Sequence, residues 1–214
     1  MNSFFEELES NKTMEDDEDI PVFKIVIVGD ADVGKTSLLL RYITQAYQEG
    51  VRSTIGVDVK KKIVEVQGHK VGLAFYDTAG QEKFQSVSDS YFNGSTACIV
   101  VYDITRLTTF KNIEKWVAMI KNKLYDVPIL FVGNKSDIEQ QRDVRLEDGE
   151  NMAKRFNAFF METSCLNGNG VNKAINILVE HAVSDKLVQT LKESQRNSVT
   201  LEKPNVVQDK TTCC

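Results

Sequence analysis

The nine residues 29–37, GDADVGKTS, constrain the fold of this chain more than any other stretch. They match the pattern G-x-x-x-x-G-K-[ST], in which a glycine-rich loop wraps the phosphate groups of a nucleotide. The stretch follows the apolar run VFKIVIV at 22–28 and precedes SLLLRYI at 37–43, which is typical of a helix. A strand, a loop and a helix in this order are the context in which the pattern holds phosphate. We therefore expect an α/β protein with a phosphate-binding loop at the end of its first strand.

The side chains of this loop suggest phosphate binding, but two of them carry the same negative charge as phosphate. Lys35 is expected to reach the β and γ phosphates of a nucleotide, and the hydroxyl of Thr36 to ligate magnesium. Two aspartates, Asp30 and Asp32, are unusual in a site for a polyanion. Because backbone N–H groups do most of the holding, the side chain of Asp30 can point away. The carboxylate of Asp32 cannot lie far from the phosphates, so we expect it to hasten nucleotide release; the alternative is that it turns into water without effect.

Further apolar runs alternate with helical patterns along the chain. ACIVVYD at 97–103 and PILFVGN at 128–134 are short and nearly continuous, as in strands buried on both faces of a parallel sheet. Residues 61–77 instead indicate two extended segments joined at QGHK, an antiparallel pair at the sheet edge. Helical spacing of three and four is found at Phe110, Ile113, Val117, Ile120 and Leu124, and again at Val171, Ala174, Ile175, Leu178 and Ala182. The sum predicts a doubly wound, mostly parallel six-stranded sheet with one antiparallel edge strand.

Composition limits the domain organisation and the partners. A chain of 214 residues is long enough for one folded domain, expected over 21–185, between a mobile acidic extension at 1–20 and a variable polar tail at 186–214. The net charge is −5 and the strongest charge run, MEDDEDI at 14–20, is acidic, which argues against nucleic-acid binding. No stretch approaches the roughly 20 apolar residues that span a bilayer, and the N-terminus lacks the pattern of a secretory signal. We therefore expect the protein in the cytosol.

The four cysteines predict neither a disulfide framework nor a metal site. Cys98 lies inside an apolar run and is expected to be a small core residue. Cys213 and Cys214 are adjacent at the very end of the chain, so they need another explanation.

Two more stretches extend the site towards a metal ion and a reacting water. In DTAGQE at 77–82, Asp77 ends a strand and can hold magnesium through water. The N–H of Gly80 can meet a γ phosphate, and Gln81 is placed to orient an attacking water. In STIG at 53–56, Thr54 adds a second hydroxyl before the edge strand. We expect Thr36, Thr54 and Asp77 to hold Mg²⁺.

A third pair of stretches predicts which base is bound. NKSD at 134–137 closes a central strand at its carboxyl end, where open sheets bind ligands. The carboxylate of Asp137 can accept hydrogen bonds from both the N1–H and the 2-amino group of guanine, which adenine cannot offer. ETSCL at 162–166 can supply backbone N–H groups to the base oxygen. The expected ligands are therefore GTP and GDP.

With these motifs in order, the chain resembles the Ras superfamily of small GTPases and, within it, the Rab family, over about residues 21–185. The stretches IGVDV at 55–59, AFYDTAGQEKF at 74–84, SVSDSYFNG at 86–94 and VVYDIT at 100–105 carry the Rab resemblance. The resemblance implies Gln81 and Lys35 as catalytic residues and Tyr47 as the aromatic edge for the base. The full set of nucleotide-binding residues that we expect is Asp32, Val33, Gly34, Lys35, Thr36, Ser37, Tyr47, Thr54, Gly80, Asn134, Lys135, Asp137, Ser164, Cys165 and Leu166.

The resemblance also implies a biological role and partners. Rabs are membrane-traffic switches that bind effectors with GTP and become extractable with GDP. Expected partners are an exchange factor, a GTPase-activating protein, a GDP dissociation inhibitor or escort protein, and effectors, all acting on a monomer. Cys213 and Cys214 resemble the double geranylgeranylation site of Rabs, and two lipids on a tether would anchor the protein to the cytoplasmic face of an intracellular membrane.

Several positions depart from the family pattern. Val59, Tyr76 and Tyr91 stand where Rabs usually carry Phe, Trp and Tyr on the effector face, so two of the three are changed. Ala31 and Asp32 replace the usual Ser or Gly pairs. SCL replaces SAK near the base, and Val51 replaces a switch Tyr.

Three functions are compatible with some of these features. A hydrolysing GTPase switch, slow without an activator, is favoured because Gln81, Thr54 and the magnesium positions are intact. The alternative is a Rab-like guanine-nucleotide-binding scaffold with little hydrolysis, suggested by Ala31 and Asp32. A P-loop kinase or ATPase is disfavoured by NKSD.

Overall fold

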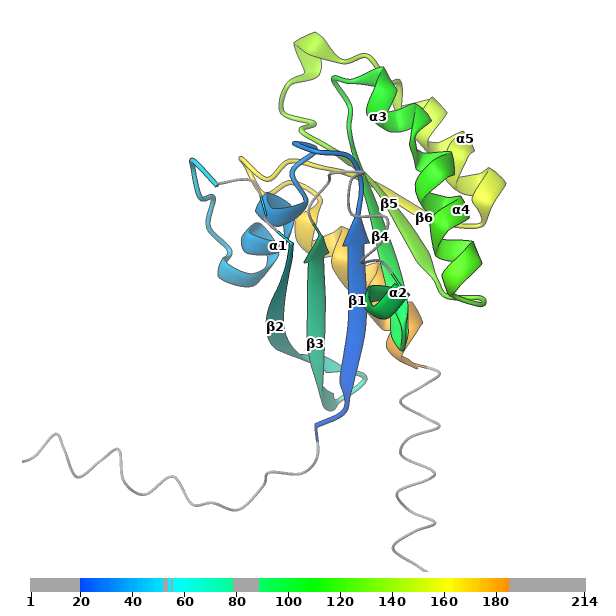
Figure 1. Ribbon diagram of the computed structural model, residues 1–214. Helices are drawn as coiled ribbons and strands as arrows, with labels where there is room; N and C mark the ends of the chain where they lie inside the picture. Colours follow the sequence, from blue (N-terminus) through cyan, green and yellow to red (C-terminus); the bar gives the residue numbers. More distant parts are fainter. Residues whose placement is uncertain (1–19, 52–53, 55, 79–88, 185–214) are drawn as a thin grey trace, which may run out of the picture.

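The computed structural model describes residues 20–51, 54, 56–78 and 89–184 (Figure 1). A six-stranded sheet with the order β2-β3-β1-β4-β5-β6 forms its centre. All neighbouring strands pair in parallel except β2 and β3, which are antiparallel, so the predicted fold class is confirmed. The strands are β1 (Val22–Val28), β2 (Val57–Val66), β3 (His69–Thr78), β4 (Ser95–Asp103), β5 (Ile129–Asn134) and β6 (Phe159–Thr163).

The central strands form where the sequence is continuously apolar. Every residue of β4 and β5 is buried, because helices cover both faces of the sheet there. The edge strand β2 is mostly exposed or half-buried. Its hairpin with β3 turns at Gln67 and Gly68, whose φ values of 52° and 79° match the left-handed two-residue turns that suit twisted strands.

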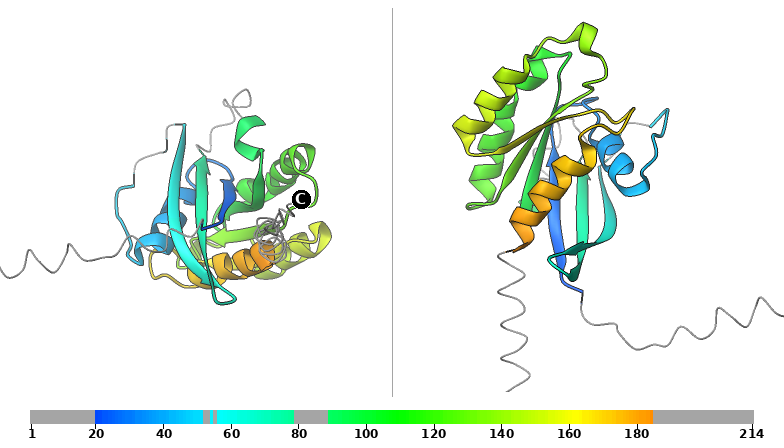
Figure 2. Two further views of the ribbon diagram at one scale, coloured as in Figure 1. Left: turned by 90° about the horizontal axis from the view of Figure 1, so that it is seen from below. Right: turned by 180° about the vertical axis from the view of Figure 1, so that it is seen from behind.

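Helices cover the sheet in two layers, each with its own apolar core. The helix α1 (Lys35–Thr44) and a helix over residues 171–184 lie on one face (Figure 2). The opposite face is covered by α3 (Leu107–Lys111), α4 (Ile113–Lys123) and α5 (Leu146–Phe156), with the short α2 (Asp89–Phe92) beside them. A 3₁₀ turn, η2 (Glu139–Gln141), follows β5. Among the described residues, no helix has the length and apolar character needed to cross a membrane.

One expected helix differs in the structure. The single helix anticipated from Phe110 to Leu124 is divided at Asn112 into α3 and α4. It also ends one residue early, since Leu124 has the extended values φ −127° and ψ 130°. The division is slight, because Asn112 keeps the helical values φ −73° and ψ −9° and makes helical backbone hydrogen bonds with Thr108 and Trp116. Its side chain donates to a carboxylate of the phosphate loop.

The carboxyl ends of β1, β3, β4 and β5 meet at the upper edge of the sheet in Figure 1. Three motif stretches end these strands or follow them, because parallel strands release their loops at the same edge. The predicted residues Gly80, Gln81, Cys213 and Cys214 lie outside the described residues, as do both tails.

Candidate nucleotide-binding site

The phosphate loop, residues 29–36, has a backbone that requires small or flexible residues. Gly29 has φ 142°, and a Cβ there would lie 2.2 Å from the carbonyl oxygen of Val101 in β4. Gly34 caps α1 with φ 94°, and its Cβ would lie 2.4 Å from Nδ2 of Asn134. Asp32 has φ 61°, a left-handed conformation that Asp tolerates better than most residues. The loop therefore packs closely against two neighbouring strands, with no room for larger residues at either glycine.

Lys35 is held inside this loop. Its Nζ donates to the carbonyl oxygens of Gly29 at 2.8 Å and Asp30 at 2.7 Å, and only 6% of the residue is exposed. Burial lowers the pKa of Lys35 to about 8, although the nearby carboxylates of Asp77, Asp30 and Asp32 oppose this shift. A bound polyanion would stabilise the charged form further, so the lysine suits a phosphate ligand.

The carboxylate of Asp30 points towards α4, as its place in the loop suggested. Its Oδ2 accepts a hydrogen bond from Nδ2 of Asn112 at 2.6 Å, and its Oδ1 accepts one from Nε1 of Trp116 at 2.9 Å. Both oxygens are thus used within the fold. Asp30 therefore ties the phosphate loop to the helical layer.

Three oxygen-bearing side chains meet beside the start of α1. The hydroxyl of Thr36 donates to Oδ2 of Asp77 at 2.5 Å and lies 2.6 Å from the hydroxyl of Thr54. Asp77 is fully buried, and its Oδ1 has no hydrogen-bond partner among the described residues. Burial raises the pKa of Asp77, and the hydrogen bond from Thr36 opposes the shift.

This cluster fits a hard cation. Hydroxyl and carboxylate oxygens are the ligands that Mg²⁺ prefers, and a cation would both neutralise Asp77 and use its unpaired oxygen. Among the described residues no three His, Cys, Asp or Glu side chains gather in a way that could hold a metal. Thr36, Thr54 and Asp77 instead combine two hydroxyls with one carboxylate.

The base motif is bound to the phosphate loop by Asn134. At the end of β5, its Nδ2 donates to the carbonyl oxygen of Val33 at 2.8 Å. Its Oδ1 accepts from Oγ1 of Thr163 at 3.2 Å and from Sγ of Cys165 at 3.3 Å. Asn134, Val33 and Thr163 are almost fully buried, so this amide fixes three loops with respect to one another.

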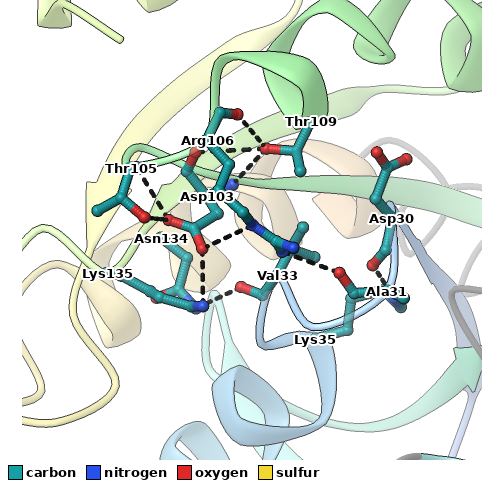
Figure 3. Close-up of polar contacts among 10 residues, drawn as sticks. All are labelled: Asp30, Ala31, Val33, Lys35, Asp103, Thr105, Arg106, Thr109, Asn134 and Lys135. Atoms are coloured by element: carbon teal, nitrogen blue, oxygen red, sulfur yellow. Dashed lines mark hydrogen bonds and ion pairs between the residues drawn. The ribbon is translucent and has the colours of Figure 1, made fainter. Parts of the chain in front are cut away.

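The next residues of the motif contact side chains of neighbouring strands and loops. Lys135 adopts φ 67° and its Nζ lies 2.7 Å from Oδ2 of Asp103 at the end of β4 (Figure 3). The carboxylate of Asp137 is exposed and accepts a hydrogen bond from the hydroxyl of Ser164. The predicted stretches NKSD and ETSCL are therefore brought together in space.

The remaining predicted residues have different surroundings. Cys165 is buried, and burial raises the pKa of its thiol to about 11, which suits a structural role better than a reactive one. The side chains of Tyr47 and Leu166 are 45% and 54% exposed. Ser37 follows Thr36 in the first turn of α1 and is partly buried.

Sequence reasoning missed two residues of this region, Asp103 and Arg106. Asp103 is 1% exposed although charged. Its carboxylate forms ion pairs with Lys135 and Arg106 and accepts hydrogen bonds from Thr105. Burial alone would raise its pKa, but the hydrogen bonds from Lys135 and Thr105 hold the pKa of Asp103 below its ordinary value. The position of Asp103 in the sequence could have revealed it, because it is an acidic residue at the end of a continuously apolar run. Burial of such a charge without a partner costs free energy, so a partner was to be expected.

Known proteins are similar to this chain over most of its length. The family model described as "Ras: Ras family" matches residues 24–184. The chain is 38% identical over 174 residues to the Ras-related protein RABA5b of Arabidopsis thaliana, covering 79% of this chain and 80% of that protein. It is 36% identical over 192 residues to RABA5e of the same plant, covering 88% and 87%. It is 37% identical over 178 residues to the Ras-related protein Rab-11C of Dictyostelium discoideum, covering 81% and 80%.

Proposed function

Since the chain belongs to the Ras family and, within it, to the Rab family of small GTPases, we propose that it is a membrane-anchored GTP/GDP switch that regulates vesicle traffic by recruiting effectors. The observation that carries this proposal is the arrangement around one loop. The phosphate loop, residues 29–36, contains Lys35 and one member of the Thr36–Thr54–Asp77 cluster. It also contacts the Asn134–Asp137 stretch through Asn134. A nucleoside polyphosphate has a base and a phosphate chain and binds a metal ion. Asn134–Asp137, Lys35 and the Thr36–Thr54–Asp77 cluster offer one recognition element for each of them.

At the phosphate end, the chain's own residues would act mainly by placement and charge. The backbone N–H groups of the loop, from Asp32 to Ser37, would hold the phosphates, and Lys35 would exchange its two carbonyl acceptors for phosphate oxygens. Mg²⁺, held by Thr36, Thr54 and Asp77, would supply neutralisation of phosphate charge. Gly80 would donate its N–H to the γ phosphate.

At the base end, discrimination would come from hydrogen bonds. Asp137 would accept from the N1–H and the 2-amino group of guanine, while the N–H groups of Ser164, Cys165 and Leu166 would meet the base oxygen. Asn134 and Lys135 would hold this loop in place, and Tyr47 would cover the edge of the ring. A site built in this way rejects adenine because acceptors covered by the bound base would be left unpaired.

Hydrolysis would depend on Gln81, which would align a water with the phosphorus atom. No arginine is committed to the γ phosphate by the chain's own motifs, so we expect turnover far below one per second without an activating protein. The second candidate is a guanine-nucleotide-binding scaffold with little hydrolysis, which the residues Ala31 and Asp32 in the phosphate loop suggest. Single-turnover hydrolysis of GTP by the wild-type protein separates the two candidates.

A substitution tests the switch itself. Gln81→Leu should leave GTP and GDP binding intact but lower activator-stimulated hydrolysis at least about tenfold, because the attacking water is no longer oriented. The measurement is phosphate release in the presence of a Rab-activating protein, with nucleotide affinity as the control. Equal stimulated rates for variant and wild type would contradict the hydrolytic role of Gln81.

Anchoring is proposed through Cys213 and Cys214. One lipid chain gives only marginal, reversible binding, so two adjacent prenyl groups suit a stable but extractable anchor. The protein would then move between cytosol and the cytoplasmic face of a membrane with a GDP dissociation inhibitor or escort protein, while exchange factor, activating protein and effectors act on its nucleotide state. Deleting both cysteines should shift the protein wholly to the soluble fraction of a cell lysate; membrane association that persists would reveal a different anchor.

A further inference from the structure

Arg106 lies where three loops of the candidate site meet. It comes three residues after the end of β4 and is the residue that precedes α3. Its Nε donates to Oδ2 of Asp103 at 3.1 Å, and its Nη2 donates to the carbonyl oxygen of Ala31 at 2.9 Å (Figure 3). One guanidinium therefore contacts both the buried acid at the end of β4 and the phosphate loop.

Asp103 gives this contact a fixed anchor. Its Oδ1 accepts hydrogen bonds from the backbone N–H of Thr105 at 2.9 Å and from its hydroxyl at 2.7 Å. Its Oδ2 receives both Arg106 and Nζ of Lys135, which belongs to the base loop. A continuous path of charged hydrogen bonds thus runs from the base loop through Asp103 and Arg106 to Ala31. Such bonds are stronger than neutral ones, and the planar fork of an arginine fixes direction as well as distance.

Arg106 also brings a positive charge to the residue that carries an unexpected negative one. The carbonyl group of Ala31 is bonded directly to the nitrogen of Asp32. Covalent geometry therefore places the guanidinium within about 8 Å of the Asp32 carboxylate. The two charges act in opposite directions on the pKa of Lys35, which Asp32 raises and Arg106 lowers. A cation at this place reduces the repulsion that Asp32 would exert on a phosphate chain.

We propose that Arg106 is a positioning residue for nucleotide binding, which joins the phosphate loop to the base loop and offsets the charge of Asp32, so that the protein releases nucleotide slowly. The proposal requires only guanine-nucleotide binding by a member of this family. It does not depend on membrane anchoring, traffic or the rate of hydrolysis.

The first test is the rate of GDP dissociation in excess magnesium, measured on the full chain with a fluorescent nucleotide. Arg106→Gln removes the hydrogen bond to Ala31 and the positive charge that offsets Asp32. We expect release about tenfold faster than in wild type, about threefold from each loss. Arg106→Lys keeps the charge but not the fork, so its rate should lie between the two. Lys135 still pairs with Asp103 in both variants, so the melting temperature should change little.

The second test isolates the charge offset. Asn in place of Asp32 keeps the size of the side chain and tolerates the left-handed conformation, but it carries no charge. In the Asp32→Asn background, Arg106→Gln should accelerate release by only about threefold, because residue 32 then carries no charge that Arg106 could offset. At high salt the accelerations in the two backgrounds should converge, since screening weakens the offset.

The matched control is Arg145→Gln. Arg145 likewise precedes a helix and donates to an aspartate, Asp148, at 2.9 and 2.7 Å, but it lies at the start of α5 and its two bonds go to Asp148 alone. This variant should release GDP at the wild-type rate. Release at the wild-type rate by Arg106→Gln would overturn the proposal. So would an acceleration that is equal for Gln and Lys at position 106 and unchanged by Asp32→Asn or by salt, because Arg106 would then only support the fold.

Discussion

The base half and the metal half of the site are built in different ways. In the base half, Asn134, Lys135 and Asp103 have protein partners for their polar groups, and each partner lies on a different loop. In the metal half, Thr36, Thr54 and Asp77 bond mainly to one another, and Oδ1 of Asp77 is buried without a partner among the described residues. Both halves border the same loop and have similar burial.

The base half is pre-organised in the free protein, whereas the metal half is completed only when a ligand binds. A fully satisfied network fixes its loops before any nucleotide arrives, which lowers the entropy lost on binding. A cluster with an unpaired buried carboxylate oxygen is complete only when a cation or a proton is added. Substitutions in the base half should therefore damage the free protein, whereas those in the metal half should show their cost mainly when Mg²⁺ and nucleotide bind.

The largest effect is expected from Asn134→Ala. The change leaves the buried carbonyl of Val33 without its donor, and the buried hydroxyl of Thr163 without its acceptor. Two buried unsatisfied groups cost about 3 kcal/mol of unfolding free energy. For a domain of this size we expect a melting temperature about 9 °C lower in the nucleotide-free protein, measured by calorimetry.

Thr54→Ala is the matched change in the metal half. It removes a hydroxyl that lies 2.6 Å from Thr36 but leaves the bond from Thr36 to Asp77. The nucleotide-free protein should lose no more than about 1 kcal/mol, while the gain in GDP affinity on adding Mg²⁺ should fall. Equal losses of stability in the two variants would remove the distinction between the halves.

The second prediction concerns specificity in the base half. Asp137→Asn replaces two acceptors by one acceptor and one donor, which mismatches guanine and suits xanthine, whose ring has a carbonyl at position 2. Affinity for GTP should fall by about one to two decades, the cost of a polar group left unpaired against the bound base. Competition between GTP and XTP for a fluorescent nucleotide measures the change. A variant that still prefers GTP would show that this stretch does not read the base.

The third and smallest effect is the pH dependence of Asp77→Asn. Burial raises the pKa of Asp77 above its ordinary value of 3.8, so folding favours the protonated form. The stability that this group contributes is fully present below pH 3.8 and is lost as pH rises through its higher folded pKa. At pH 7 the charged carboxylate thus destabilises the nucleotide-free protein. The variant should melt higher there, and its advantage should shrink as the pH falls through the raised pKa of Asp77 towards 3.8.

Addition of Mg²⁺ and GDP gives the sharpest control for this prediction. The wild type should then melt at a higher temperature than the variant, because Mg²⁺ stabilises the charged carboxylate of Asp77. If the variant is the less stable protein at pH 7 even without ligands, the unpaired oxygen of Asp77 is not a source of strain.

Much of the fold could be predicted from local patterns. The runs at 22–28, 97–103 and 128–134 are continuous because helices cover both faces of the sheet, and they form β1, β4 and β5 within two residues. The turn at QGHK was visible because a glycine separates two extended segments. The strand β6 is only half-buried along most of its length, so its apolar pattern is weaker and does not define its range.

The site could be predicted only where its chemistry lies in short motifs. Spacing along the chain placed Lys35 and Thr36 on one turn and Asn134 and Asp137 on one loop, so their proximity needs no knowledge of the fold. Arg106 contacts a carbonyl group 75 positions earlier in the chain, and Trp116 contacts a carboxylate 86 positions earlier. Such contacts depend on the order of strands in the sheet and on the path of the helices, which no local pattern contains.

The bond between Trp116 and Asp30 has a spectroscopic consequence. Trp116 is the single tryptophan of the chain, and its indole N–H lies 2.9 Å from a carboxylate in the phosphate loop. Indole emission shifts with the electric field along the ring and with the strength of this hydrogen bond. The backbone carbonyl of the same aspartate accepts from Lys35, the residue proposed to grip the phosphates. The protein therefore carries a built-in optical reporter, and its intrinsic fluorescence follows the loop without any attached dye.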